Sequence, residues 1–379
     1  MPLQSIKRLA FVSTLFLASS MTAAEDKPPT TSPTTRPANF TLAQITENVE
    51  KSEHWFRNVY VKNFKTEIDA QKKGETEWQT TPKKFNGSAW FDETPGGKTR
   101  IYFALNVWDV QGGNYPYQAE TSDMAWNGTQ GRSLQIALGR KGNLNPTFPG
   151  HAMVITHQPP VLLASRYTRY QIGSAYTAQY FVTEMEGVTP AQPRKSISAT
   201  FKRVLEVADD PKHQPSVSPT IFAEDVNGFQ TICVRWVIKS STVSAETAYW
   251  FSPEKNFALV RQLSSLVQSK VHQTETLDVK DMKEVSPGIW FPIRAERVQS
   301  DFDGGYLRYR YEAQDVIANN EKFDEAIFTP QIPVGFLVSS DDPNEALYML
   351  DLEYNKIEIH KGEAIPNVKP QTPKRPDAK

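Results

Sequence analysis

Long stretches of this sequence alternate apolar and polar side chains with a period of two, and this alternation limits the possible fold more than any other feature. In "KTRIYFALNVW", the side chains of Ile101, Phe103 and Leu105 share one face, and in "FQTICVRWVI" those of Val234 and Trp236 do so. The stretches "NFALVRQL" and "YLRYRYEA" alternate in the same way. Because successive side chains of a strand point to opposite faces, the pattern predicts an antiparallel sheet with two unlike faces.

Turn sequences separate the strand stretches, and two segments have helical spacing instead. The turns are "DETPGG", "SPEKN" and "SDFDGG". Thr41 and Gln44 form a capping-box sequence, and Ile45 and Val49 follow at helical spacing. A second helix is predicted from Pro159, in "PPVLLASRYTRY". The fold class predicted from these patterns is α+β, with the sheet as the main element.

The two ends of the chain differ in composition from the region between them. Residues 1–24 have a basic start, a short apolar run and small residues, which is typical of a cleaved secretory signal peptide. Residues 25–39 are rich in Pro and Thr and predict a disordered linker, and residues 363–379 predict a disordered tail. Residues 40–362 are predicted to form a single domain. We therefore expect a periplasmic or secreted protein without an integral membrane segment in the mature chain.

Cysteine content and charge limit the environment and the partners. Cys233 is the single cysteine, so no internal disulfide can form and stability must come from a packed core. A secreted chain without disulfides favours a bacterial envelope. The formal net charge is −1 and no basic block stands out, which argues against nucleic-acid binding.

The stretch "ETPGGKTR" ends its glycines with Lys-Thr, as a phosphate-binding loop does. Such a loop needs a glycine five positions before its last glycine and a helix after Lys-Thr. Asp92 occupies the first position, and an alternating strand sequence follows. We therefore predict a hairpin turn and no nucleotide site.

Other catalytic and metal-binding patterns are missing from the sequence. Neither the GxSxG elbow nor HExxH occurs, and the six histidines are scattered. Asp301 and Asp303 resemble the start of a calcium loop, but the later ligands are missing, so a hairpin turn is predicted. No catalytic residue, metal ligand or cofactor is predicted, and the protein is expected not to be an enzyme.

Aromatic residues on the strand stretches leave two interpretations open. The tryptophans concerned are Trp90, Trp236, Trp250 and Trp290. They can form the filled core of an ordinary sheet, or they can line the concave wall of a curved sheet that holds an apolar ligand.

The order of the elements resembles the LolA/LolB-like envelope lipoprotein carriers over residues 40–315. The first hairpin lies in "FNGSAWFDETPGGKTRIYF", the second turns at Asn127 in "DMAWNGTQGRSLQI", and a late hairpin spans Trp250 to Asn256 in "AYWFSPEKNFALVRQL". The segment "SISATFKRVLEVADDP" precedes the late strands. This resemblance implies a curved antiparallel sheet, an incomplete barrel, wrapped around a helical plug with an apolar hollow between them.

Members of that group ferry acylated lipoproteins or bind lipids. The resemblance thus implies a binding protein that holds a lipid, or the acyl chain of a lipoprotein, between sheet and helix. Candidate wall residues are Phe103, Leu105, Trp236 and Trp250, with Arg100 at the rim. The alternatives are a non-enzymatic envelope scaffold with a filled core and, ranked last, a secreted hydrolase. The oligomeric state is left open.

This chain is longer than the resemblance accounts for. It carries an insertion at "QGGNYPYQAE" and a C-terminal extension, in which "LYMLDLEYNKIEIHKG" predicts an added strand with Ile357 and Ile359. Such additions could fill or cover the hollow.

Overall fold

The computed structural model describes residues 36–92, 99–106, 119–138, 150–155, 197–209, 219–239, 243–268, 271–300, 304–320, 325–360 and 368, except positions 54, 57, 128, 341 and 343. The predicted signal peptide, the helix expected from Pro159 and the predicted tail 363–379, apart from residue 368, lie outside the described residues. All described residues belong to the unit Thr35–Lys379.

The described residues form strands and a few helices, with the following bounds. The helices are α1 (Leu42–Glu53), α4 (Ile197–Asp209) and the 3-10 helices η3 (Pro253–Lys255) and η4 (Glu325–Phe328). The strands are β1 (Arg36–Pro37), β2 (Asn58–Gln71), β3 (Gln79–Asp92), β4 (Thr99–Asn106), β5 (Ala119–Trp126), β6 (Gly131–Leu138), β7 (Gly150–Ile155), β8 (Thr220–Val226), β9 (Phe229–Lys239), β10 (Val243–Ser252), β11 (Ala258–Gln268), β12 (Val271–Ser286), β13 (Ile289–Ser300), β14 (Tyr306–Ala318), β15 (Leu337–Ser340), β16 (Leu347–Leu350) and β17 (Lys356–Ile359).

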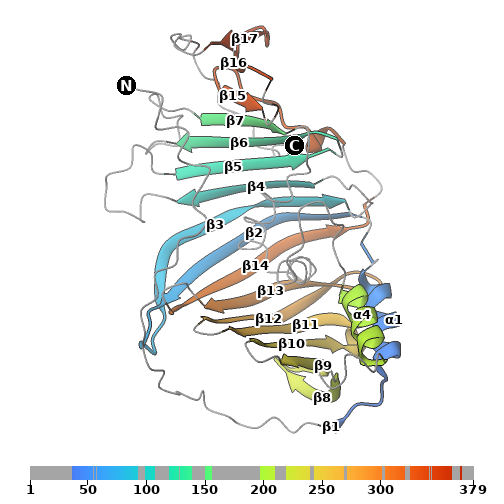
Figure 1. The fold of residues 1–379 in the computed structure, drawn as a ribbon. Helices are drawn as coiled ribbons and strands as arrows, with labels where there is room; N and C mark the ends of the chain where they lie inside the picture. The colour runs from blue at the N-terminus through green and yellow to red at the C-terminus, as the bar shows by residue number, and fades with distance from the viewer. Residues whose placement is uncertain are drawn as a thin grey trace. The chain divides into compact units, whose positions relative to one another are not determined.

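These strands form one sheet, and their spatial order differs from their order in the chain. Neighbouring strands run β1-β8-β9-β10-β11-β12-β13-β14-β2-β3-β4-β5-β6-β7-β15-β16-β17. Every pair is antiparallel except β7–β15, which is parallel. The sheet is curved and does not close on itself (Figure 1). The predicted α+β fold with an incomplete antiparallel barrel is therefore confirmed.

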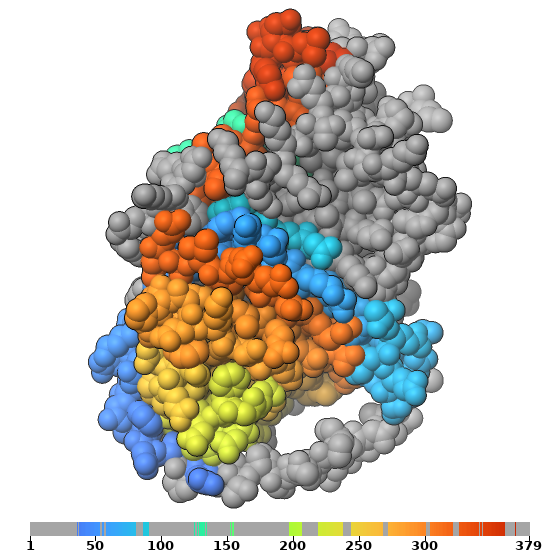
Figure 2. Space-filling view, turned by 180° about the vertical axis from the view of Figure 1, so that it is seen from behind, coloured from blue at the N-terminus to red at the C-terminus, as the bar shows by residue number. Residues whose placement is uncertain are grey.

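A junction between distant parts of the chain lies in the middle of this sheet. Strand β14 pairs with β2, so that Tyr311 lies opposite Thr66 and Val316 opposite Val61. Figure 2 shows the same arrangement from behind, with the orange surface of the later strands against the blue surface of the early ones. On either side of this junction, neighbouring strands are consecutive in the chain, except at β1–β8 and β7–β15.

The hairpins predicted from the turn sequences are present. Strands β3 and β4 pair antiparallel with Phe91 opposite Thr99, so a strand, and not the helix of a phosphate-binding loop, follows "PGGKT". At the second hairpin, the Asn127 side-chain oxygen accepts hydrogen bonds from the backbone N–H of Thr129 at 3.0 Å and of Gln130 at 2.8 Å. At the late hairpin, η3 ends at Asn256, whose φ of 52° gives the left-handed conformation that Asn tolerates.

Helix α1 begins with the predicted capping box. The Gln44 side-chain oxygen accepts a hydrogen bond from the Thr41 N–H at 2.9 Å, and the Thr41 hydroxyl accepts one from the Gln44 N–H at 3.3 Å. This reciprocal pair satisfies donors that an uncapped helix leaves unpaired. The apolar side of α1, formed by Leu42, Ile45 and Val49, is buried.

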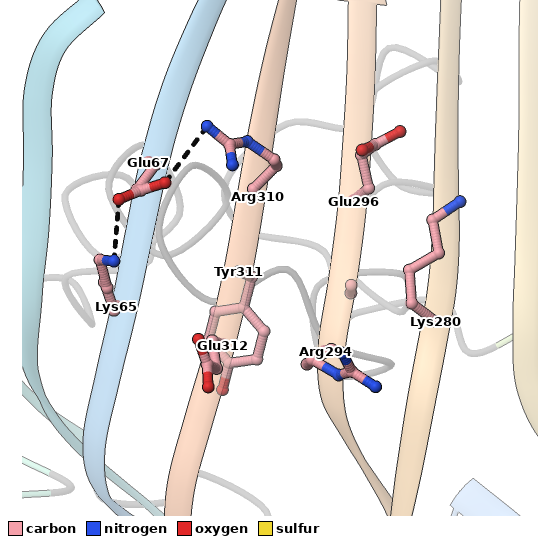
Figure 3. A pocket seen from close by; sticks show the side chains of 9 residues that line it. Lys65, Glu67, Lys280, Arg294, Glu296, Arg310, Tyr311 and Glu312 are labelled. Carbon is pink, nitrogen blue, oxygen red and sulfur yellow. Dashed lines mark ion pairs between the residues drawn. The ribbon is translucent and has the colours of Figure 1, made fainter. Parts of the chain in front are cut away.

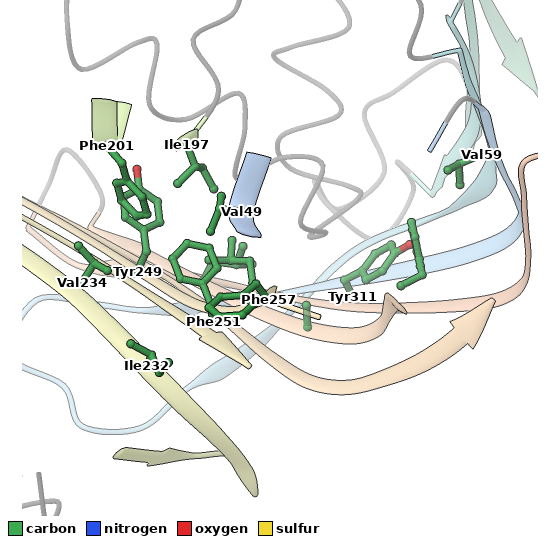
Figure 4. Packing of buried hydrophobic residues seen from close by; sticks show 14 of the residues in the cluster. Val49, Val59, Ile197, Phe201, Ile232, Val234, Tyr249, Phe251, Phe257 and Tyr311 are labelled. Atoms are coloured by element: carbon green, nitrogen blue, oxygen red, sulfur yellow. The ribbon is translucent and has the colours of Figure 1, made fainter. Parts of the chain in front are cut away.

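The main hydrophobic core lies between α1, α4 and one face of the sheet. Figure 4 shows side chains of α1 and α4, including Val49 and Ile197, against strand residues such as Phe251 and Phe257. Tyr309 and Tyr311 of β14 belong to this core, whereas Arg308 and Arg310 form ion pairs with Asp69. The predicted division of β14 into an apolar and a polar face is therefore confirmed.

The C-terminal extension lengthens the sheet at its β7 edge. Strand β17 confirms the strand predicted around Ile357 and Ile359, and β16 and β15 connect it to β7. A separate hydrophobic cluster joins this extension to β6 and β7, with Leu134 and Val154 against Phe336 and Val338. The described part of the extension thus adds strands and a small core of its own.

Candidate ligand site between the helix pair and the sheet

Helices α1 and α4 are tied to each other by charged side chains. The Glu53 carboxylate at the end of α1 accepts hydrogen bonds from the Ser198 N–H, at 3.1 Å, and from the Ser198 hydroxyl. A second bridge joins Lys202 Nζ to Glu50 Oε1 at 2.6 Å. Glu53 therefore caps the N-terminus of α4, where a negative charge also interacts favourably with the helix dipole. The C-terminal end of α1 lies beside the N-terminal end of α4.

Phe201 anchors α4 to the sheet through three other aromatic rings. Its ring centre lies 5.9 Å from that of Trp236, 5.7 Å from Tyr249 and 5.8 Å from Phe251, each in an edge-to-face arrangement. Such contacts add to the free energy gained by burying the rings. Phe201 is fully buried, so the α4 side of the helix pair is firmly packed.

A small cavity lies near the point where α1 ends and α4 begins, and we call it the helix–sheet slot. Its volume is about 50 Å³, and its walls are mostly apolar. The residues that line it are Val49, Ser52, Glu53, Trp55, Phe56, Ile197, Phe251, Phe257, Ala258, Leu259, Met282, Trp290 and Pro292. This volume holds a few water molecules or the end of an alkyl chain, but not a whole acyl chain.

The two tryptophans of the slot lie on its outer side. Trp55 and Trp290 are half-buried, whereas Phe251 and Phe257 are buried. The ammonium group of Lys255 sits 3.5 Å from the centre of the Trp290 ring, a cation–π contact. The Asn319 side chain donates a hydrogen bond to the Trp55 carbonyl at 2.8 Å. The slot therefore combines an aromatic outer side with a buried apolar floor.

The structure separates the two tryptophans predicted as wall residues. Trp236 faces the helices and contacts Phe201. Trp250 belongs to another hydrophobic cluster, with Cys233 and Ala248, and its indole N–H donates a hydrogen bond to Glu224. Neither residue lines the helix–sheet slot. Where β9 and β10 pair, Trp236 lies opposite Thr247 and Trp250 lies opposite Cys233. Because Thr247 and Trp250 are an odd number of positions apart on β10, the period-two alternation puts the two tryptophans on different faces.

The three other predicted residues lie on β4, away from the slot. Arg100 pairs with Trp90 and Phe103 with Gly87 on β3, and Leu105 pairs with Glu120 on β5. Strands β14, β2 and β3 separate β4 from the slot strands β10–β13. The structure does not bring these residues together with Trp236, and their role as ligand contacts stays a prediction.

Sequence reasoning named one slot residue, Trp290, among the tryptophans that could line a ligand wall, and it missed the others. Several of the slot residues flank turns: Phe251 and Phe257 enclose η3, and Trp290 and Pro292 follow the turn between β12 and β13. The signal present in the sequence is the repeated placement of aromatic residues beside turns. This signal does not reveal that two hairpins meet under the same helix.

A larger, charged groove crosses strands β2, β12, β13 and β14. Its volume is about 300 Å³, and Figure 3 shows its side chains. Glu67 bridges Lys65 of its own strand at 2.8 Å and Arg310 of the neighbouring strand β14 at 3.2 Å. The bridge to Arg310 is a cross-strand charge pair of a polar sheet face. We attribute this groove to structure: its opposite charges compensate each other along the strands.

The described part of the chain shows neither a metal-binding group nor a membrane-spanning helix. Within it, no group of three or more His, Cys, Asp or Glu side chains is placed to hold a metal ion. None of the helices described there is both long and apolar enough to span a lipid bilayer. Burial raises the pKa of the Cys233 thiol, so the thiol stays protonated near neutral pH.

Comparison with known proteins gives similarity to solved structures alone. No family model and no curated protein matches the chain. A DUF1329 family protein from Desulfovibrio piger has a TM-score of 0.35 and 9% identity, covering 76% of this chain and 96% of its own. A putative outer membrane lipoprotein-sorting protein domain from Vibrio parahaemolyticus has a TM-score of 0.34 and 7% identity, covering 75% of this chain and 94% of its own.

The second structure is described as a lipoprotein-sorting protein domain, which is the kind of protein that the order of elements in this chain resembles. At these TM-scores and identities, neither structure carries information about the activity or the ligand of this chain.

Proposed function

We propose that this chain is a non-enzymatic binding protein that holds an apolar ligand, a lipid or the acyl chain of a lipoprotein, in the helix–sheet slot. A periplasmic or secreted location follows from the predicted signal peptide. The observation that carries the proposal is the slot itself, a mostly apolar cavity with half-buried tryptophans on its outer side. Burying an apolar chain there contributes roughly 25 cal/mol per Å² of apolar surface.

Binding of a whole acyl chain requires the helix pair to move from the sheet, because the slot holds only about 50 Å³. The bridges from Glu53 to Ser198 and from Glu50 to Lys202 make α1 and α4 move together. The apolar contact between the acyl chain and the sheet then replaces the contact between the helices and the sheet. The opening therefore exchanges one apolar contact for another.

A variant that fills the slot tests the proposal. Leu259→Trp places an indole among the slot residues, so we expect the affinity for a fluorescent acyl probe to fall by roughly tenfold or more. The matched control is Leu263→Trp on the same strand, because Leu263 does not line the slot and packs against the cluster that contains Trp250 and Cys233. Circular dichroism of both variants checks that they fold. Equal binding by the two variants would place the ligand elsewhere.

A scaffold with a filled core is the second candidate, and the small volume of the slot favours it. For this candidate, native mass spectrometry after gentle purification should show the protein without lipid, and the acyl probe should not bind. Co-purifying lipid, or saturable probe binding that Leu259→Trp abolishes, would reject the scaffold and support the binding protein.

A further inference from the structure

The helix-facing side of the sheet is not apolar throughout. One row of residues in register crosses it, with Gln262 on β11, Leu277 on β12, Arg297 on β13 and Tyr309 on β14. Leu277 and Tyr309 belong to the main core with the helices, which fixes the face to which this row points. We define the polar zone by five polar residues of this row and the next: Gln262, Glu275, Arg297, Gln299 and Tyr309.

Most members of the polar zone bind each other. Arg297, with 4% of its surface exposed, donates from Nε to Glu275 Oε1 at 2.7 Å. Its guanidinium carbon lies 5.8 Å from the Tyr309 ring centre, and Gln299 Nε2 lies 3.5 Å from the Tyr309 hydroxyl. A buried ion pair is a weak stabiliser compared with apolar side chains of the same size. Stability alone therefore does not account for the placement of this pair.

Gln262 is the member whose bonding is incomplete. The residue is 4% exposed, and its buried Oε1 atom has no hydrogen-bond partner among the described residues. Rotating the amide by half a turn exchanges its oxygen and nitrogen and still leaves one polar atom at that point. A hydroxyl group both donates and accepts, so it satisfies the amide in either orientation.

The polar zone continues directly from the helix–sheet slot. Leu259 lines the slot, and Gln262 follows on the same face of β11, roughly 10 Å further along the strand. Tyr249 lies opposite Gln262, and Phe251 lies opposite Leu259. Because Tyr249 and Phe251 are two positions apart on β10, Leu259 and Gln262 share a face. Beyond Gln262, the Glu275 side chain is 25% exposed, so polarity increases along the strands from the slot toward solvent.

We propose that the ligand is an amphiphile of the monoacylglycerol class and that Gln262 recognises a hydroxyl of its head. The acyl chain occupies the slot, and the head lies in the polar zone, where the Arg297–Glu275 pair provides a polar surrounding. Gln262 thereby determines which head is accepted, while the slot accepts the chain. This inference rests on the proposed function.

The test compares two ligands with the same acyl chain, a monoacylglycerol and the corresponding methyl ester, by displacement of the fluorescent acyl probe. For the wild type we expect the monoacylglycerol to bind roughly tenfold more tightly, because the ester leaves the amide unpaired. Gln262→Leu should bring the two affinities within about twofold of each other and keep the affinity for the ester. The exposed Gln273 gives the control variant Gln273→Leu, which should keep the preference.

The possible outcomes separate this inference from the proposed function. If the wild type binds both ligands equally, or if Gln262→Leu keeps the preference, the assignment of Gln262 is wrong and the binding function stands. If the wild type binds neither ligand, the proposed function fails together with this inference. Gln262→Leu removes an unpaired polar atom, so its thermal unfolding should show a melting temperature no lower than that of the wild type.

Discussion

Asp69 shows how a single buried charge is held on the polar face of the sheet. About 1% of its side chain is exposed, and its carboxylate accepts hydrogen bonds from Arg308 at 2.9 Å and from Arg310 at 2.9 and 3.1 Å. Burial by itself raises the pKa of Asp69, but hydrogen bonds from Arg310, Arg308 and Thr80 outweigh it and hold the pKa below its usual range. The charged form is therefore the one that the fold stabilises.

Asp69→Asn is expected to lower the free energy of unfolding at pH 7 by about 3 kcal/mol, because two arginines lose their shared counter-charge. Since the folded-state pKa is depressed, this contribution is present above the unfolded pKa of about 3.9 and is lost as the pH falls through the folded value. Urea unfolding at a series of pH values from 7 downward measures it, and the difference between the two proteins should shrink as the pH falls through the folded-state pKa. Glu296→Gln, on the same face, is the control. A variant as stable as the wild type at pH 7 would contradict this account.

Tyr311 presents the opposite case, a buried hydroxyl without a hydrogen-bond partner among the described residues. Burial raises its pKa, so the phenolate does not form near neutral pH. Tyr311→Phe should therefore leave the free energy of unfolding unchanged or raise it by up to about 1 kcal/mol. Tyr309→Phe, which removes a hydroxyl in contact with Gln299, should lower it. Thermal denaturation distinguishes the two, and a clear loss in Tyr311→Phe would reveal a partner for that hydroxyl.

At the scale of elements, Glu53 joins two helices that are far apart in the sequence. Glu53→Ala removes the cap of α4, so we expect the free energy of unfolding to fall by about 1–2 kcal/mol and the bound acyl probe to dissociate faster. Glu47→Ala is the control, because Glu47 pairs with Lys51 on an exposed side of α1 and should have no measurable effect. Stopped-flow dissociation and urea unfolding measure both. Identical behaviour of the two variants would argue against coupled helices.

Local elements could be predicted from the sequence where their signals are local. The capping box of Thr41 and Gln44, the turn at Asn127 and the hairpin around η3 each depend on residues a few positions apart. Helix α4 has no counterpart among the predicted helices, although Ile197, Phe201 and Val204 have helical spacing. Its segment precedes the alternating sequences of the late strands, and their period of two obscures the helical spacing.

At the scale of the whole sheet, the sequence could not predict which strands meet. The pairing of β14 with β2 and of β7 with β15 joins segments whose own sequences carry no mark of their partner. The candidate site depends on the same pairings, because the slot unites the ends of α1, η3 and the β12–β13 turn. Alternation placed Trp236 on one face together with Val234, but which face turns toward the helices, and which residues form the slot, depend on the tertiary arrangement.

The pairing of β2 with β14 also determines when the molecule can form. Val61 has its partner Val316 only after nearly the entire chain has left the ribosome. Until then the early strands lack a neighbour on one side, and the apolar faces under α1 have no closed core to enter. A nascent chain with this connectivity therefore completes its central sheet only near the end of its synthesis, whatever its local hairpins do before then.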